Sequence, residues 1–155
     1  MCKFCWGLVL VLVLVMAGAI YKFGFRGSVA PASDGRTAVQ LTAGERDLVL
    51  VEMRAFLESV QAIVQALGSE EMPAVVQAAR NVGMNAQQEV PASLVVKLPG
   101  ALKKLGFDTH RKFDQLALDA EEFGDPKQSL EQLGELMQNC IGCHAAYKLV
   151  AVEEK

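Results

Sequence analysis

Residues 125–148, DPKQSLEQLGELMQNCIGCHAAYK, decide the fold class of this chain. Asp125 is a natural N-cap and Pro126 suits the first position of a helix. Apolar residues then recur at intervals of three and four, the spacing of one helical face: Leu130, Leu133, Leu136, Met137 and Ile141. This pattern predicts an amphipathic helix from 126 to about 150.

Three further helices are predicted upstream of this one. We expect them at about 43–67, 70–87 and 109–123, with a short helix near 99–105 in the long connection between the last two. Thr42 and Glu45 have the spacing of a capping box at the start of the first, and Gly124 ends the third. Four amphipathic helices joined in this way predict an all-α domain, an antiparallel four-helix bundle with one long crossover.

The composition agrees with a single small helical domain. The chain has 155 residues, of which 52% are hydrophobic and 21% charged, and this excludes wholesale disorder. The net charge is −3 with acids and bases interspersed, so no nucleic-acid partner is predicted. No nucleophile–base set, acid/base pair or phosphate-binding loop is visible, so no enzymatic activity is predicted.

The N-terminal segment predicts contact with a membrane. Residues 4–21, FCWGLVLVLVLVMAGAIY, carry no charge, and about 18 residues are just long enough to span a ~30 Å hydrocarbon core. Trp6 and Tyr21 stand near its ends, as interfacial aromatics do. Two interpretations stay open: a single transmembrane helix within an uncleaved anchor at 1–26, which we favour, or a signal peptide cleaved at Ala17-Gly18-Ala19.

The N-terminal part has two other features, a small polar segment and a CxxC pair, and we assign no chemistry to either. Residues 27–43, GSVAPASDGRTAVQLTA, are small and polar and contain Pro and Gly, so we interpret them as a linker to a domain at 44–155. Cys2 and Cys5 form a CxxC without a partner pair or a βαβ context nearby. We interpret these two as small apolar residues at the membrane boundary.

The motif CIGCH at 140–144 carries the chemistry of the chain. CxxCH is the attachment signature of c-type haem. Two thiols three positions apart can form thioethers to one edge of the porphyrin, and the adjacent histidine then supplies the proximal imidazole to the iron. Two alternatives remain: buried thiols without a cofactor, and a zinc site, which needs two more ligands that have no recognisable spacing here.

With CIGCHAAYK near its C-terminus and a Met-bearing first helix, the chain resembles the cytochrome c′ family, including its low-spin cytochrome c-556 branch. The resemblance covers roughly residues 43–150. It implies one covalent haem c and the residues around it: Cys140 and Cys143 as thioether residues, His144 as proximal ligand, and Lys148 near the haem edge.

The resemblance also implies a distal residue on the first helix. Met53, in LVLVEMRAF, matches that position, and Phe56, one turn later, would pack against the distal side. Family members with Met there are six-coordinate and low-spin, whereas members with an apolar residue are five-coordinate. The chain departs from the family at Val49, where a basic residue is frequent. We expect His110 to be a solvated or capping histidine rather than an iron ligand.

An iron held by His144 and Met53 would be saturated, which suits electron transfer. We therefore predict a monohaem c-type cytochrome, with a five-coordinate NO- or CO-binding protein and a structural subunit without loaded haem as alternatives. The family attaches haem outside the bacterial cytoplasmic membrane, so the anchor would hold a periplasmic domain at the inner membrane. Expected partners are the membrane, redox proteins or subunits of a larger complex, and a second copy in a homodimer.

Overall fold

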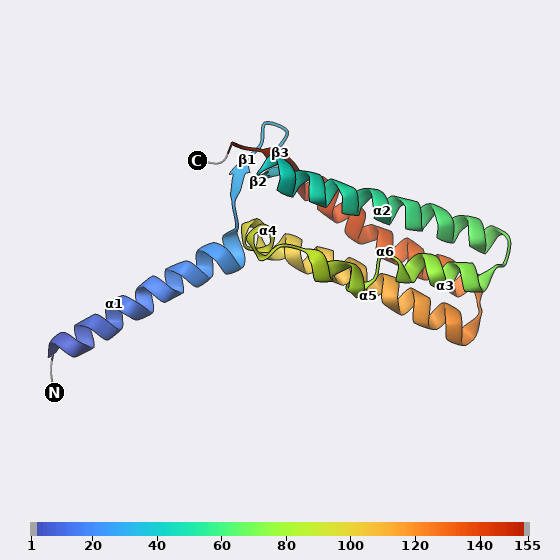
Figure 1. Ribbon diagram of the computed structural model, residues 1–155, viewed down its shortest axis with the longest axis horizontal. Helices are drawn as coiled ribbons and strands as arrows, with labels where there is room; N and C mark the ends of the chain where they lie inside the picture. Colours follow the sequence, from blue (N-terminus) through green and yellow to red (C-terminus); the bar gives the residue numbers. More distant parts are fainter. Residues whose placement is uncertain (1–2, 154–155) are drawn as a thin grey trace.

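The computed structural model describes residues 3–153, apart from the side chains of residues 3–5, 88 and 89. Cys2 lies outside the described residues, so the interpretation of Cys2 and Cys5 is not tested. Within the described part the chain is mostly helical, as predicted (Figure 1). The α-helices are α1 (Lys3–Ile20), α2 (Ala43–Gly68), α3 (Met72–Arg80), α4 (Ala92–Lys97), α5 (Gly100–Phe123) and α6 (Pro126–Ala146).

The remaining elements are short. A π-helical segment, η1 (Tyr21–Arg26), continues α1, and a 3₁₀ helix, η2 (Met84–Glu89), follows α3. One sheet contains β1 (Val29–Pro31), β2 (Thr37–Leu41) and β3 (Tyr147–Ala151).

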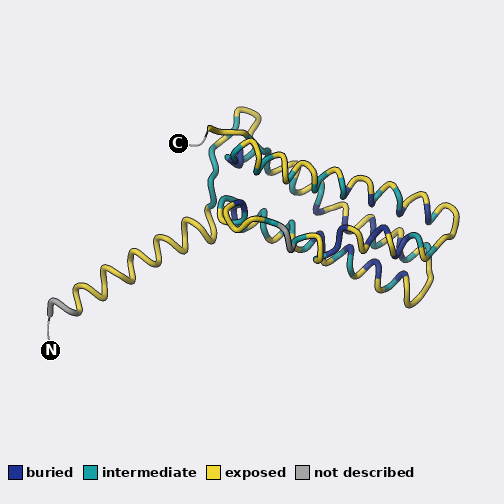
Figure 2. Tube along the Cα trace, in the orientation of Figure 1, coloured by how far each residue is buried: buried dark blue, intermediate teal, exposed yellow. Residues whose placement is uncertain are grey.

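The N-terminal helix stands apart from the rest of the protein. α1 and η1 together give a candidate membrane span over Trp6–Arg26, none of which is buried inside the protein. Figure 2 shows this segment exposed along its described length. By length and composition the helix can cross a membrane, and a signal sequence would have the same properties.

The larger apolar core lies among α2, α3, α5 and α6, which run alongside one another (Figure 1). All four helices contribute side chains without solvent exposure, among them Ile63, Val75, Phe113, Leu116 and Leu136. Burying each such side chain stabilises the fold by about 1.5–3 kcal/mol. These four helices therefore owe their association to one shared cluster.

Several helix ends lie where local sequence signals predict them. Thr42 Oγ1 accepts a hydrogen bond from the Glu45 N–H at 3.3 Å, and the Glu45 carboxylate accepts one from the Thr42 N–H at 2.9 Å. This reciprocal pair is the predicted capping box. Asp125 caps α6 with Pro126 in its first turn, and Gly124 ends α5 in the left-handed conformation, at φ 60°.

Other boundaries differ from the prediction. α5 begins at Gly100, so the predicted short helix near 99–105 and the third helix are one continuous helix. Thr109, where we expected the third helix to begin, lies inside α5, and its hydroxyl donates to the Leu105 carbonyl one turn earlier, at 2.8 Å. α3 ends at Arg80 and is followed by η2, instead of continuing to 87.

The sheet corrects two predictions, the all-α class and the linker at 27–43. β2 pairs antiparallel with β1 and parallel with β3, and Thr37 lies opposite Tyr147. Because the chain enters β3 at Tyr147, α6 ends before the predicted residue 150.

A second, smaller core stabilises this sheet. Val39 and Leu41 of β2 are fully buried and pack with Leu94 of α4. Leu149 of β3 packs against the same cluster from the other end of the chain. One of the two partner strands of β2, β3, is remote in sequence. Local composition therefore suggests a linker at 27–43.

Candidate functional site

The CxxCH motif occupies the last turns of α6. Cys140 and Cys143 are both free and half-buried, and Cys140 packs against the larger core. Burial raises the pKa of both thiols, and a charge on Cys140 would raise that of Cys143 further. A thiol with a raised pKa carries little thiolate at neutral pH. Neither thiol therefore has the lowered pKa of an activated catalytic cysteine.

The side of α6 that faces α5 is held by polar bonds. The buried Asn139 amide donates to Asp108 Oδ2 at 3.0 Å and to Thr109 Oγ1 at 3.3 Å, and its oxygen accepts from Lys112 Nζ at 3.3 Å. The bond from Asn139, helped by Lys112, lowers the pKa of Asp108. These bonds fix the rotation of α6 directly before the CxxCH motif.

The opposite side of α6 is apolar and exposed. Met137 and Ile141 each stand two residues from Asn139, which is about 200° around the helix. Their side chains are 40% and 59% exposed. His144 follows Met137 by two turns and so lies on the same side, also exposed. Arg36 donates to the His144 carbonyl at 3.3 Å and holds the backbone there.

A groove shows that the apolar side of α6 faces α2 at the start of α6. Its volume is about 400 Å³, and it lies between the C-terminal end of α2 and the N-terminal end of α6. The groove is lined by Val64, Leu67, Gly68, Pro126, Lys127 and Leu130. We call the junction between these two helix faces the α2–α6 seam.

Met53 and His144 lie on the two faces that form the α2–α6 seam. Met53 is three turns before Val64 and shares its face of α2, and His144 is four turns after Leu130 and shares its face of α6. Met53 is half-buried and packs against the same core cluster as Cys140. Met53 of α2 and Cys140 of α6 therefore both border the larger core.

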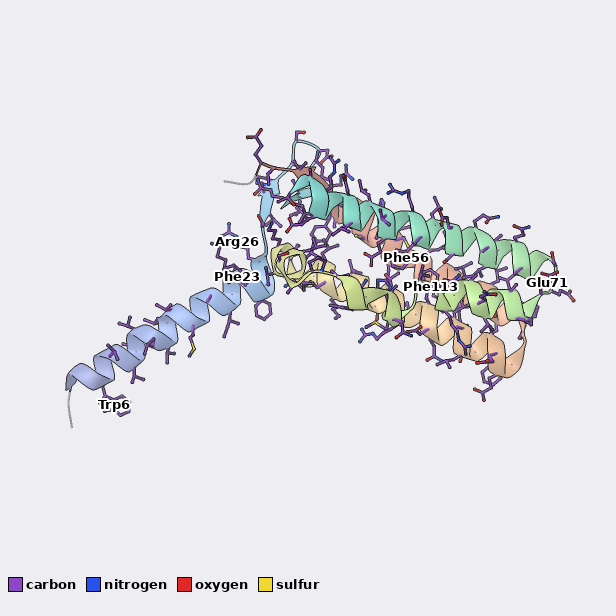
Figure 3. The ribbon with its side chains drawn as sticks, viewed as in Figure 1. Trp6, Phe23, Arg26, Phe56, Glu71 and Phe113 are labelled. Carbon is purple, nitrogen blue, oxygen red and sulfur yellow. The ribbon has the colours of Figure 1, made fainter. Side chains whose placement is uncertain are left out.

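Phe56 lies in the core one turn from Met53. Its ring stacks on Phe113, with centroids 5.5 Å apart and planes 7° apart, and the centroid of the His110 ring lies 4.8 Å away. Figure 3 shows Phe56 and Phe113 between the helices. This stack forms part of the core behind the face of α2 that carries Met53.

Lys148 lies on β3 rather than in a helix. Its ammonium is 3.3 Å from Asp34 Oδ2, and Asp34 also pairs with Arg36 at 2.9 Å. The bonds from Arg36, with help from Lys148, hold the pKa of Asp34 well below its ordinary value. This cluster ties the loop between β1 and β2 to the end of α6.

The expectation that His110 is solvated is wrong, since its side chain is only 1% exposed. Nδ1 lies 2.7 Å from the Val82 carbonyl oxygen, and Nε2 lies 3.2 Å from a Glu52 carboxylate oxygen that also accepts a bond from Gln87. Burial alone would lower the pKa of His110, but the bonds to Glu52 and Val82 raise it.

A sequence signal for this burial exists. His110 continues the apolar stripe of Phe113, Ala117 and Ala120 at intervals of three and four. The prediction begins this helix at 109, which puts His110 at a helix end and hides its place on the apolar stripe. In the structure α5 begins at Gly100.

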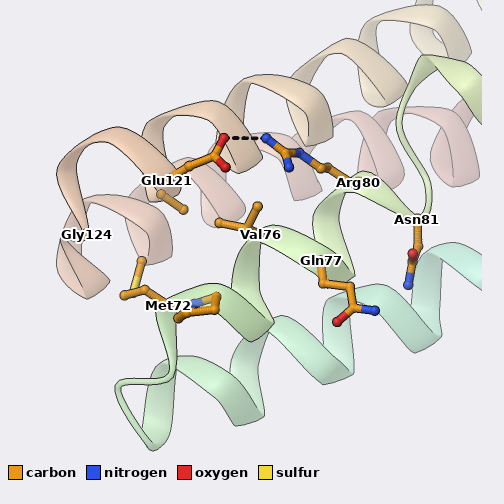
Figure 4. A pocket seen from close by; sticks show the side chains of 9 residues that line it. Met72, Val76, Gln77, Arg80, Asn81, Glu121 and Gly124 are labelled. Atoms are coloured by element: carbon orange, nitrogen blue, oxygen red, sulfur yellow. Dashed lines mark hydrogen bonds and ion pairs between the residues drawn. The ribbon is translucent and has the colours of Figure 1, made fainter.

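A larger groove, of about 510 Å³, lies between α3 and the end of α5 (Figure 4). Met72 and Val76 contribute apolar lining, and Arg80 pairs with Glu121 across it. The lining residues include no nucleophile–base pair.

Among residues 3–153, no three His, Cys, Asp or Glu side chains come together in a way that could hold a metal ion. The zinc alternative therefore has no counterpart in the described part of the chain. A haem iron needs fewer protein ligands than zinc, because the porphyrin itself supplies most of the ligands. No family model matches this chain, and neither the curated proteins nor the solved structures contain a match.

Proposed function

We propose that this protein is a membrane-anchored monohaem c-type cytochrome, similar to the cytochrome c′ family, that carries electrons on the periplasmic side of a bacterial inner membrane. The observation that carries the proposal is the CxxCH motif at the end of α6. Helical periodicity supports it, because it extends the groove-lining faces of Val64 and Leu130 to Met53 and His144. The donor set fits a haem: two thiols one turn apart, an adjacent imidazole, and a thioether from a second helix.

The proposal takes α2, α3, α5 and α6 as an antiparallel four-helix bundle. In that arrangement, moving back along α2 corresponds to moving forward along α6. Val64 and Leu130 line one groove, so three turns back along α2 and three turns forward along α6 bring Met53 level with Ile141. Met53 is then opposite the CxxCH motif.

Each residue has a separate role in this account. Cys140 and Cys143 would hold the group by thioether bonds, and His144 and Met53 would bind its iron. When bound, haem supplies one-electron redox chemistry, and a Met ligand raises the potential. The exposed side chains of Ile141 and Met137 would be covered by the apolar porphyrin.

The surroundings of these residues favour a site that changes little between oxidation states. Asn139 fixes α6 from the α5 side, and the stack of Phe56 on Phe113 supports the helix that carries Met53. A site that is rigid and has no open coordination position suits electron transfer better than turnover of a substrate.

α1 would anchor this domain in the inner membrane. Its partners would be redox proteins or subunits of a larger membrane complex, and a second copy could form a homodimer. Anchoring confines the domain to a thin layer and raises its effective concentration toward partners in the same membrane.

An optical spectrum of the membrane fraction, with and without CO, tests the proposal. Low-spin reduced bands that CO does not move support ligation by His144 and Met53. A high-spin spectrum that shifts with CO supports the five-coordinate, gas-binding alternative. A negative pyridine haemochrome assay on the purified protein contradicts both and favours a structural or assembly subunit.

A further inference from the structure

The candidate membrane helix is joined to the folded domain by specific contacts. The Lys103 ammonium donates to the carbonyl oxygens of Phe23 at 3.0 Å and Gly24 at 3.3 Å. The Ser28 N–H donates to the Lys97 carbonyl at 2.7 Å. η1 therefore packs on α4 and on the start of α5, as Figure 1 shows.

Gly27 makes the turn from η1 into the sheet. Its φ of +67° lies in the left-handed region, and a Cβ at this position would be 2.4 Å from the Lys97 carbonyl oxygen. Glycine meets both demands at no steric cost. The path of the chain from the membrane helix into the domain is thus fixed by close packing.

Helix length places this junction at the level of the lipid headgroups. A ~30 Å hydrocarbon core takes about 20 helical residues, which reaches Phe25 when counted from Trp6. The candidate span ends at Arg26. Because Lys103 bonds the Phe23 carbonyl, the first turns of α5 lie at the same level.

The segments at this level carry positive charges without acidic residues. Residues 20–33 and 92–107 contain no Asp or Glu, and their cations are Lys22, Arg26, Lys97, Lys103 and Lys104. Lys97 is paired with Glu45 at 2.7 Å, whereas Lys104 is exposed to solvent. Local charge is therefore complementary to an anionic surface.

Apolar side chains are exposed among these cations. Phe25 in η1, Val96 in α4 and Phe107 in α5 are all exposed. Phe107 follows Lys103 and Lys104 by about one turn and so shares their side of the helix. Aromatic and aliphatic side chains beside lysines are typical of segments that lie in the membrane interface.

We propose that η1, α4 and residues 100–107 form a docking surface for anionic phospholipid headgroups, so that the domain rests on the bilayer at this corner. The inference rests on the anchoring part of the proposed function and is independent of haem. Charge complementarity and the continuous chain from α1 select phospholipid as the occupant. The sheet and the CxxCH end of α6 would then face the membrane, and the opposite end of the helices would point away (Figure 1).

Hydrogen–deuterium exchange of the full chain in nanodiscs tests this surface. We compare discs of phosphatidylcholine with discs that also contain phosphatidylglycerol. Amides of residues 92–107 are expected to exchange several-fold more slowly in the anionic discs, and those at the start of α6 equally in both. Lys104→Gln leaves the Lys103 bonds in place. It should reduce the slowing of exchange at residues 92–107 in the anionic discs about five-fold.

Lys127→Gln is the matched control, because Lys127 is 85% exposed and lies at the far end of the helices. It should keep the full lipid dependence. Equal exchange in both lipids overturns the docking surface while the anchor stands. If the chain does not co-purify with the discs, the anchor and the docking surface are both wrong. The optical spectrum would then still test whether the protein binds haem.

Discussion

The two sides of α6 differ in their surroundings: the side toward α5 is hydrogen-bonded, and the side toward α2 is apolar and exposed. Toward α5, the buried Asn139 makes three hydrogen bonds, and Gln132 donates to Asp119. Toward α2, the flank of α6 carries the exposed apolar residues Leu130, Met137 and Ile141. The amide of Asn139 is thus satisfied by the protein alone. An exposed apolar flank marks a surface for another group, and in our proposal that group is the porphyrin.

The largest expected effect concerns the two cysteines of the motif. In the double variant Cys140→Ser and Cys143→Ser, no thioether can form, so covalent haem should be lost. Haem staining after denaturing electrophoresis measures this, and Cys5→Ser is the matched control that should stain like the natural chain. Staining of the double variant at full strength would contradict the assignment of the motif.

The variant Met53→Leu tests the α2 face of the seam. Leu conserves the volume of Met, so the fold should be kept at a cost below about 1.5 kcal/mol. The loss of the sulfur should remove the low-spin spectrum, lower the midpoint potential and allow CO to bind. Met137→Leu, on the same helix as His144, should leave the spectrum unchanged. A natural spectrum in Met53→Leu would exclude Met53 as the distal ligand.

The variants Asn139→Ala and Ile141→Ala compare the two sides of α6 directly. Asn139→Ala removes bonds from a buried site and should lower the free energy of unfolding by about 1–3 kcal/mol. Ile141→Ala, at an exposed site, should change it by at most about 0.5 kcal/mol in the haem-free protein. Denaturant titration measures both, and equal costs would show that the apolar flank is already a packed interface.

The smallest expected effect is a pH dependence from His110. The folded-state pKa is raised, so the protonated ring stabilises the fold fully below its unfolded pKa of about 6.5. That contribution is lost as the pH rises through the folded value. The free energy of unfolding should therefore fall as the pH rises above about 6.5, and His110→Gln should flatten this slope. An unchanged slope in the variant would assign the dependence to another group.

The parts of the fold that local chemistry specifies were predictable. The capping box of Thr42 and Glu45 and the start of α6 at Asp125-Pro126 depend on residues within one turn. The pairing of β2 with β3 depends on partners from opposite ends of the chain, so no local pattern predicts it.

The candidate site divides in the same way. The CxxCH motif is readable because its chemistry lies within five consecutive residues. Met53 follows from the family resemblance, and its face of α2 emerges only from the groove shared by Val64 and Leu130. His110 is misjudged because its burial depends on α5 starting at Gly100.

The mass of the intact chain, purified from the membranes of a host that makes c-type cytochromes and measured after denaturation, tests the central claim most directly. We expect a polypeptide that carries the added mass of one haem and has no thiol at Cys140 or Cys143 open to alkylation. A polypeptide of unmodified mass, with both thiols alkylated, would contradict it.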